Sequence, residues 1–286
     1  MNRKIIQSLV LLCNNAYLAG FLNGRIYKGK LKSLCVPGLN CYSCPGAVGS
    51  CPIGSLQAVM GHYRYRFTFY VTGLLMLFGL LFGRLVCGFL CPFGLLQELL
   101  HKIPFPKVRK LWKWLLRVKY VILIVFVLAL PALSKGSIGI SSPAFCKYIC
   151  PAGTLTAGLP LLIAEPAMRG ALGWLFTLKS AIAFVTILGC LSVYRFFCKV
   201  MCPLGAFYGL FNKIALYRLR LSEENCVHCG ECSKACKMMV DPSRTPDSPE
   251  CIRCGDCVKA CRFSALRAGV DAPRVFSAGV PKPGKL

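Results

Sequence analysis

Two cysteine-rich segments near the C-terminus share the spacing C-x2-C-x2-C-x3-C, beginning at Cys226 and Cys251. In this spacing three neighbouring thiolates bind one 4Fe-4S cubane, and the fourth cysteine reaches across to the other cluster. Gly230 and Gly255 lie where the backbone must pass close to the inorganic sulfurs. The spacing predicts a first cluster on Cys226, Cys229, Cys232 and Cys261, and a second on Cys251, Cys254, Cys257 and Cys236.

Zinc is the main alternative for clustered cysteines, but structural zinc sites need separate tetrads, which the triple spacing fits poorly. Lys237 and Arg262 stand where such motifs usually have proline, which bears on reduction potential and helix geometry and leaves ligation intact. His228 lies between two predicted ligands, and we expect it to face solvent.

A second cysteine pattern repeats along the rest of the chain. The tetrad Cys-Pro-x-Gly begins at Cys51, Cys91, Cys150 and Cys202. Three copies also have a cysteine four residues earlier, at Cys87, Cys146 and Cys198. The remaining copy has Ala47 in that position, with Cys35, Cys41 and Cys44 upstream. Proline favours the first turn of a helix, so each tetrad cysteine should cap a helix N-terminus, where N–H groups favour a thiolate or an anionic cluster.

Apolar segments accompany these motifs. The chain of 286 residues is 56% hydrophobic with a mean hydropathy of +0.59, more than a soluble domain needs. Segment 150–164 is apolar, too short to span a bilayer and interrupted by Pro160, so we expect it to be re-entrant. Four segments approach the length of about 20 residues that crosses a bilayer, namely 5–22, 67–86, 118–134 and 175–195.

The distribution of basic residues predicts orientation. The net charge is +25, but Lys and Arg gather beside apolar segments instead of forming one stripe with aromatics, which argues for lipid headgroups and against nucleic acid. The loop between the second and third spans is the most basic, so we expect it in the cytoplasm with both chain ends. The sequence thus predicts a multi-pass protein of the cytoplasmic (inner) membrane, with its ferredoxin module on the cytoplasmic side.

The predicted fold is an all-α membrane domain (1–220) with a small α+β two-cluster ferredoxin domain (221–271) and a loose tail (272–286). The membrane domain would have four transmembrane helices in two tandem hairpin repeats, 1–105 and 115–215, with short re-entrant or interfacial helices. Pairing the repeats about an axis along the membrane normal would bring together Cys87, Cys91, Cys198 and Cys202 at the inner face. The outer face would hold Cys146, Cys150, Cys35, Cys41, Cys44 and Cys51, six candidates for one four-ligand cluster.

Disulfides and simple packing are the alternatives for these cysteines. A reducing cytoplasm disfavours disulfides at the inner face, whereas a disulfide in the outer set stays open. Cys13 and Cys190, each alone in a span, are expected to pack between helices. His62 and His101 are candidates for hydrogen bonding to a quinone, although packing as interfacial aromatics is favoured.

These motifs together resemble the NapH/NosR group of membrane ferredoxins over about residues 65–265. The resemblance implies a four-helix membrane domain with a cytoplasmic ferredoxin, serving quinol oxidation or electron supply to an extracytoplasmic reductase or its maturation. The chain departs from the group in having three Cys-x-x-x-Cys-Pro motifs where two are common. It also shows no flavin-attachment domain or Rossmann fingerprint.

The predicted function is single-electron transfer across or along the membrane, between a cytoplasmic or quinone-pool donor and a redox partner protein. A quinol dehydrogenase subunit and an assembly or regulatory factor supplying reducing equivalents to a metalloenzyme are the alternatives. We expect two 4Fe-4S clusters in the ferredoxin domain and one or two more in the membrane domain, with quinone and lipid as further ligands. The chain is predicted to be an electron-transfer component rather than an enzyme on its own.

Overall fold

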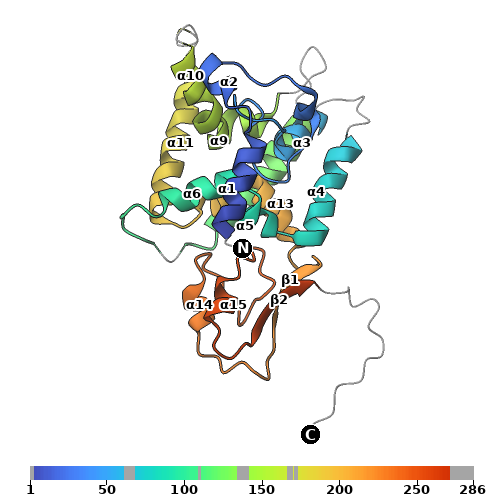
Figure 1. Ribbon diagram of the computed structural model, residues 1–286, viewed down its shortest axis with the longest axis vertical. Coiled ribbons are helices and arrows are strands. Elements are labelled where there is room, and N and C mark those ends of the chain that lie inside the picture. The colour runs from blue at the N-terminus through green and yellow to red at the C-terminus, as the bar shows by residue number, and fades with distance from the viewer. Residues whose placement is uncertain are drawn as a thin grey trace.

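The computed structural model describes residues 3–60, 68–108, 111–133, 142–165, 170 and 173–270. A helical part carries a small α+β module at one end, as Figure 1 shows. The predicted loose tail and His62 lie outside the described residues.

Short helices dominate the first half of the helical part. They are α1 (Arg3–Asn14), α2 (Ala19–Asn23), the 3-10 helix η1 (Lys30–Ser33), α3 (Pro52–Met60), α4 (Thr68–Phe82), α5 (Leu85–Phe89) and α6 (Pro92–Leu100). Helices α3 and α6 each begin at the proline of a Cys-Pro-x-Gly tetrad, because proline fits the first helical turn and offers no N–H that would need a partner.

The second half repeats this arrangement. It contains α7 (Leu115–Ile122), η2 (Leu123–Ala129), α8 (Leu130–Leu133), η3 (Phe145–Ile149), α9 (Pro151–Gly153), η4 (Thr154–Gly158), α10 (Leu159–Ala164), α11 (Trp174–Ser192), α12 (Phe196–Val200) and α13 (Pro203–Phe211), where η2, η3 and η4 are π-helical. Here α9 and α13 begin at the tetrad prolines, with Cys150 and Cys202 as N-caps. The predicted N-cap position of the tetrad cysteine is thereby confirmed for these helices, and for α6 with its N-cap Cys91, and the Cys202 sulfur also accepts a capping hydrogen bond.

Two of the four predicted spans have the length and apolar composition to cross a membrane. They are the continuous segment Leu115–Leu133, formed by α7, η2 and α8, and the helix Trp174–Ser192. The apolar helix Phe69–Phe82 is shorter than the predicted second span. The predicted first span is wrong as a single helix, because α1 ends at Asn14. The side-chain amide of Asn15 donates to the Leu11 carbonyl (3.1 Å), a local hydrogen bond typical of a helix end.

The segment Pro151–Ala164 is helical throughout, so the predicted interruption at Pro160 is wrong. Pro160 lies in the first turn of α10, and the π-helical η4 immediately precedes it. A π-helical turn shifts the pattern of backbone hydrogen bonds, so the helix can continue past a proline that has no N–H to donate.

The C-terminal module is α+β as predicted. Its strands β1 (Tyr217–Leu221) and β2 (Leu266–Val270) pair antiparallel, with Tyr217 opposite Val270, so the sheet begins before the predicted boundary between 220 and 221. Helices α14 (Glu231–Ala235) and α15 (Asp256–Ala260) follow Gly230 and Gly255, whose φ angles are 77° and 82°. Glycine adopts such left-handed φ angles at little cost, which explains why it occupies both N-cap positions predicted to lie close to the clusters.

One apolar core runs through both parts of the molecule. It includes Val86 and Phe197 from the helical part, and Met238, Val240 and Ile252 from the module. The module is therefore packed onto the helical part and not merely tethered to it. In Figure 1, α5 lies at the end next to the module, whereas α2 and α10 lie at the opposite end.

Candidate iron–sulfur sites

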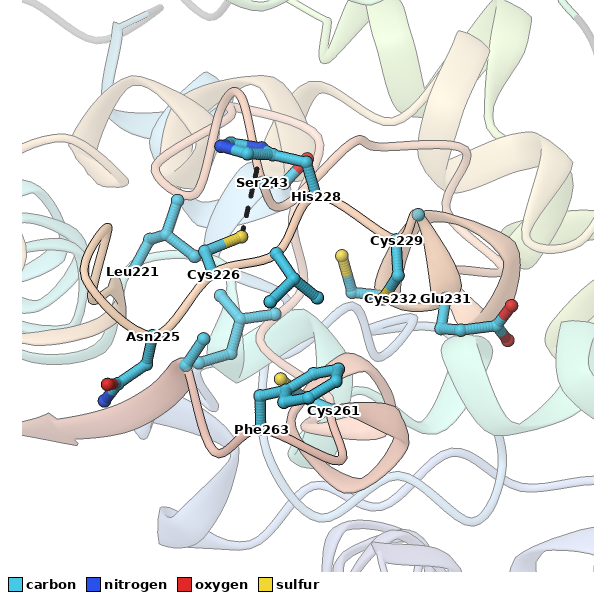
Figure 2. A pocket seen from close by; sticks show the side chains of 14 residues that line it. Leu221, Asn225, Cys226, His228, Cys229, Glu231, Cys232, Ser243, Cys261 and Phe263 are labelled. Atoms are coloured by element: carbon cyan, nitrogen blue, oxygen red, sulfur yellow. Dashed lines mark hydrogen bonds between the residues drawn. The ribbon is translucent and has the colours of Figure 1, made fainter.

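The first ferredoxin motif surrounds an open cavity of about 360 Å³. Its lining includes all four cysteines predicted for the first cluster, Cys226, Cys229, Cys232 and Cys261. Figure 2 shows their side chains arranged around a common space, with His228 beside Cys226. His228 is exposed, as predicted, and its Nδ1 lies 3.9 Å from the Cys226 sulfur.

The second ferredoxin motif surrounds a cavity of about 410 Å³. The lining includes Cys236, Cys251, Cys254 and Cys257. The fourth cysteine of each motif thus lies at the cavity of the other motif, which is the exchange that the spacing predicts.

The inner cysteines are joined by two reciprocal hydrogen bonds between the halves of the chain. Arg84 precedes Cys87 by three residues, and its Nη2 donates to the backbone carbonyl of Cys198 (2.9 Å). Arg195 precedes Cys198 by three residues, and its Nη1 donates to the backbone carbonyl of Cys87 (2.5 Å). The two halves are therefore equivalent at this point, since each arginine reaches the motif of the other half.

The glycine of each inner tetrad makes room for these guanidinium groups. A Cβ atom on Gly94 would lie 3.1 Å from Nη2 of Arg195, and one on Gly205 would lie 3.1 Å from Nη2 of Arg84. The Gly205 N–H also donates to the Cys202 sulfur (3.3 Å). The glycine that ends the tetrad thus leaves room for the arginine of the other half. Gly205 also donates a hydrogen bond to the sulfur of its own tetrad.

The inner thiols are buried and lie within electrostatic range of one another. Burial, and then the neighbouring Cys198 and Cys87 thiols, raises the pKa of Cys91 to about 12. Burial, and then Cys198, Cys87 and Cys91, raises the pKa of the Cys202 thiol well above its ordinary value. Ionising all four together requires cations among the sulfurs, which the irons of a cubane supply.

A cubane arranges its four thiolate ligands differently from a single metal ion. Among the described residues, no three His, Cys, Asp or Glu side chains converge as they would around one metal ion. A cubane has an iron at each of four corners and one thiolate on each, so its ligands surround a volume instead of a point.

Four of the six outer cysteines interact electrostatically with one another, namely Cys41, Cys51, Cys146 and Cys150. Burial, and then the Cys41 thiol, raises the pKa of Cys150 to about 12, with Cys51 also contributing. For Cys146, burial and then the Cys150, Cys51 and Cys41 thiols raise the pKa. Cβ atoms on two tetrad glycines would lie close to these sulfurs, that of Gly54 3.9 Å from Cys146 and that of Gly153 3.7 Å from Cys41.

The other two outer cysteines have different partners. The Cys35 thiol donates to the Ser55 hydroxyl (3.3 Å), and the Cys44 thiol donates to Oδ1 of Asn15 (3.7 Å). All twenty cysteines lie within the described residues, and none of these forms a disulfide. Cys44 also interacts with Cys41, whereas the interactions of Cys146 and Cys150 are with each other, Cys41 and Cys51. These contacts favour Cys41, Cys51, Cys146 and Cys150 among the six candidates that the sequence left open.

The inner and outer cysteine groups adjoin each other. The backbone N–H of Leu39 lies near the Cys91 sulfur and opposes the rise in its pKa, and the next N–H, of Asn40, does the same for Cys51. A Cβ atom on Gly38 would lie 2.9 Å from the Cys91 Cα, which shows how closely this loop packs on the inner site. Two consecutive backbone N–H groups therefore lie beside a cysteine of each group.

The ferredoxin module docks on the inner site through the loop of its second motif. Glu250 forms ion pairs with Arg84 (2.9 Å) and Lys119, and a Cβ atom on Gly88 would lie 2.7 Å from the Ile252 carbonyl oxygen. The buried Lys199 interacts with thiols of both sites, Cys236 at the cavity of the second motif and Cys198 of the inner group. The second motif is thus the one next to the helical part.

The remaining sequence predictions have mixed outcomes. The ring of His101 packs edge-on against Tyr194, and its Nδ1 lies 3.1 Å from the Cys190 carbonyl oxygen, which agrees with the favoured packing role. Cys190 is buried, as expected, but Cys13 is exposed, so its predicted packing role is wrong. Sequence reasoning missed Arg84 and Arg195, although their shared position three residues before a motif cysteine was a usable signal.

The cysteine groups on a helical scaffold with a two-motif ferredoxin module define an iron–sulfur protein. The 4Fe-4S binding domain family matches residues 67–114, 120–163 and 172–222, and the chain belongs to this family. Each matched segment contains one Cys-x-x-x-Cys-Pro motif.

Several characterised and uncharacterised proteins are similar to this chain. It is 30% identical to the uncharacterized protein MJ0750 of Methanocaldococcus jannaschii, over 60% of this chain and 66% of that protein. It is 29% identical to the methylamine utilization ferredoxin-type protein MauN of Methylorubrum extorquens, over 54% and 47%. It is 30% identical to the regulatory protein NosR of Pseudomonas aeruginosa, over 56% and 21%. The chain thus spans under two thirds of each relative, and no solved structure is significantly similar to it.

Proposed function

We propose that this protein is a membrane-bound relay of single electrons with four 4Fe-4S clusters in series. The order would be the first ferredoxin cluster, the second ferredoxin cluster, the inner site (Cys87, Cys91, Cys198 and Cys202) and the outer site (Cys41, Cys51, Cys146 and Cys150). Each cluster supplies one-electron redox chemistry when bound. The chain's own residues hold the sulfurs, balance the charge and set the distances between sites.

The observation that carries this proposal is the excess of buried positive charge. Among the described residues, Glu98 is the single buried acidic residue, whereas the buried basic residues are Lys32, Arg84, Lys119, Arg195, Lys199 and Arg253. Arg84 and Arg195 are both 0% exposed beside the inner cysteines. Glu250 pairs with both Arg84 and Lys119, and Glu98 pairs with Arg195, so the buried bases outnumber the acids that pair with them. Burying excess positive charge is costly, and a cubane with four thiolates is an anion that would offset the cost.

The packing supports this order of the relay. The second motif lies against α5, next to Cys87, whereas Cys229 of the first motif is exposed. The loop at 38–40 then lies between the inner and outer groups, close to Cys91 and Cys51. A soluble or peripheral redox partner would therefore exchange electrons at the first cluster, and a second partner near the outer site.

Membrane insertion through Leu115–Leu133 and Trp174–Ser192 accounts for the apolar exterior of the helical part. Residues such as Ile124 (60% exposed), Phe184 (62%) and Val185 (57%) have no cover within the described chain. Lipid would cover them, with the ferredoxin module on the cytoplasmic side as the loop charges predict. Because the inner and outer cysteine groups adjoin, electrons would cross part of the membrane by passing between them.

Iron and acid-labile sulfide analysis with EPR on anaerobically purified protein tests this function. About sixteen irons per chain are expected for four cubanes, whereas about eight would confine clusters to the ferredoxin module and contradict the relay. The double variant Cys91→Ser and Cys202→Ser should lose the inner signal alone. The matched control Cys13→Ser should keep all four, because Cys13 is exposed and distant in sequence from every motif.

A further inference from the structure

Two glutamines follow the first two Cys-Pro-x-Gly tetrads at the same spacing. Gln57 and Gln97 each follow their tetrad cysteine, Cys51 or Cys91, by six residues. Both are buried, at 0% and 1% exposure, on helices α3 and α6. A buried amide must have its hydrogen bonds satisfied, so the partners of these two side chains show what they are for.

Each glutamine reaches from the first half of the chain to a cysteine of the second half. Nε2 of Gln57 donates to the sulfur of Cys146 (3.3 Å), and Nε2 of Gln97 donates to the sulfur of Cys198 (3.1 Å). Both sulfurs belong to the first cysteine of a Cys-x-x-x-Cys-Pro motif. The same contact therefore occurs once at the outer site and once at the inner site.

The orientation of the amides is fixed by their other contacts. Oε1 of Gln57 accepts from the Phe145 N–H (2.9 Å), and Oε1 of Gln97 accepts from the Cys198 N–H (3.4 Å). Turning either amide over would place its oxygen against a sulfur and its NH2 group against a backbone N–H. The donor side of each amide must therefore face the thiol.

We infer that Gln57 and Gln97 are positioning residues that donate N–H···S hydrogen bonds to cluster thiolates and raise the reduction potentials of the outer and inner clusters. This inference rests on the proposed function. A reduced cluster carries one more negative charge than an oxidised one, so a donor to its sulfur stabilises the reduced form more. Hydrogen bonds to the ligands of a metal centre commonly tune its redox properties.

The other two tetrads supply a matched comparison. Thr156 and Tyr208 occupy the same position, six residues after Cys150 and Cys202. The Thr156 hydroxyl donates to the Ala152 carbonyl (2.8 Å), and the Tyr208 hydroxyl donates to the Pro37 carbonyl (3.0 Å). These hydroxyls donate to backbone oxygens, so Thr156 is a control for substitution at this position.

Redox titration followed by EPR tests the inference on the full chain. Gln57→Met keeps the length and removes the donor, and it should favour the oxidised outer cluster about tenfold, a downward shift of about 59 mV, while the inner cluster is unchanged. Gln97→Met should give the reverse pattern. Thr156→Val should shift neither potential. Clusters that remain assembled with unaltered potentials in both methionine variants would overturn the inference.

Two further measurements guard against a variant that loses its cluster. Gln57→Glu and Gln97→Glu keep an oxygen to accept the backbone N–H, and once the new carboxyl group is ionised they lack the donor, so at high pH their potentials should also fall. In the unaltered protein, pulsed EPR after selective 15N-glutamine labelling should detect coupling to both membrane-domain clusters, and absence of coupling would overturn the inference. A chain with about eight irons would instead contradict the proposed function itself.

Discussion

Arg84 donates a 2.9 Å hydrogen bond to the backbone carbonyl of Cys198, across the interface between the two halves of the chain. Arg195 makes the equivalent bond to Cys87. Each arginine thus fixes the backbone of the other half's motif and places a buried positive charge beside the sulfurs. The same guanidinium of Arg84 also pairs with Glu250 of the ferredoxin module, so one side chain connects three parts of the molecule.

The outer site gives a prediction that separates ligands from bystanders. Cys41→Ser should remove the outer cluster and about four irons, because Cys41 lies among Cys51, Cys146 and Cys150. Cys35→Ser and Cys44→Ser are matched controls that should keep it, since those thiols bond to Ser55 and Asn15. Iron counting with EPR measures the difference. Equal losses in all three variants would show that the site is assigned wrongly.

Glu250 should control the docking of the ferredoxin module. Glu250→Gln leaves Arg84 and Lys119 without their carboxylate, and removing one member of a largely buried ion pair typically costs about 3 kcal/mol or more. We expect faster hydrogen exchange in the 249–253 loop and weaker magnetic interaction between the second ferredoxin cluster and the inner cluster.

The control for this prediction is Glu231→Gln, which removes an exposed pair with Lys234 (2.8 Å) on the same module. Solvent screens such pairs, so no measurable change in docking is expected. If the two variants exchange equally, Glu250 does not hold the module in place.

Gly88 should be required for close approach of the second ferredoxin motif. Gly88→Ala introduces a Cβ 2.7 Å from the Ile252 carbonyl oxygen, a contact that forces the loop away from α5. Electron transfer from the second cluster to the inner cluster should slow, as measured by rapid-mixing EPR. Gly73→Ala adds a Cβ with no heavy atom within 4 Å, and its rate should match the unaltered protein. An unaltered rate in the Gly88 variant would count against this route.

The ferredoxin module was predictable because its information is local. Cysteine spacing alone gave the exchange of Cys236 and Cys261 between the two cavities that the structure shows. The capping role of Cys91, Cys150 and Cys202 was equally local, since it depends on the proline that follows each cysteine. The first predicted span failed because hydropathy does not register the helix end at Asn14.

Contacts between the halves were decided by tertiary structure. Cys41 and Cys44 are near neighbours of the same residue type, and only the packing of their loop against Cys146 and Cys150 separates them. The sequence by itself determined how many cysteines could bind clusters and at which helix ends they lie, because those features depend on residues a few positions apart. Which sulfurs meet, and which arginine or glutamine reaches them, depends on residues about a hundred positions apart whose burial only the folded chain defines.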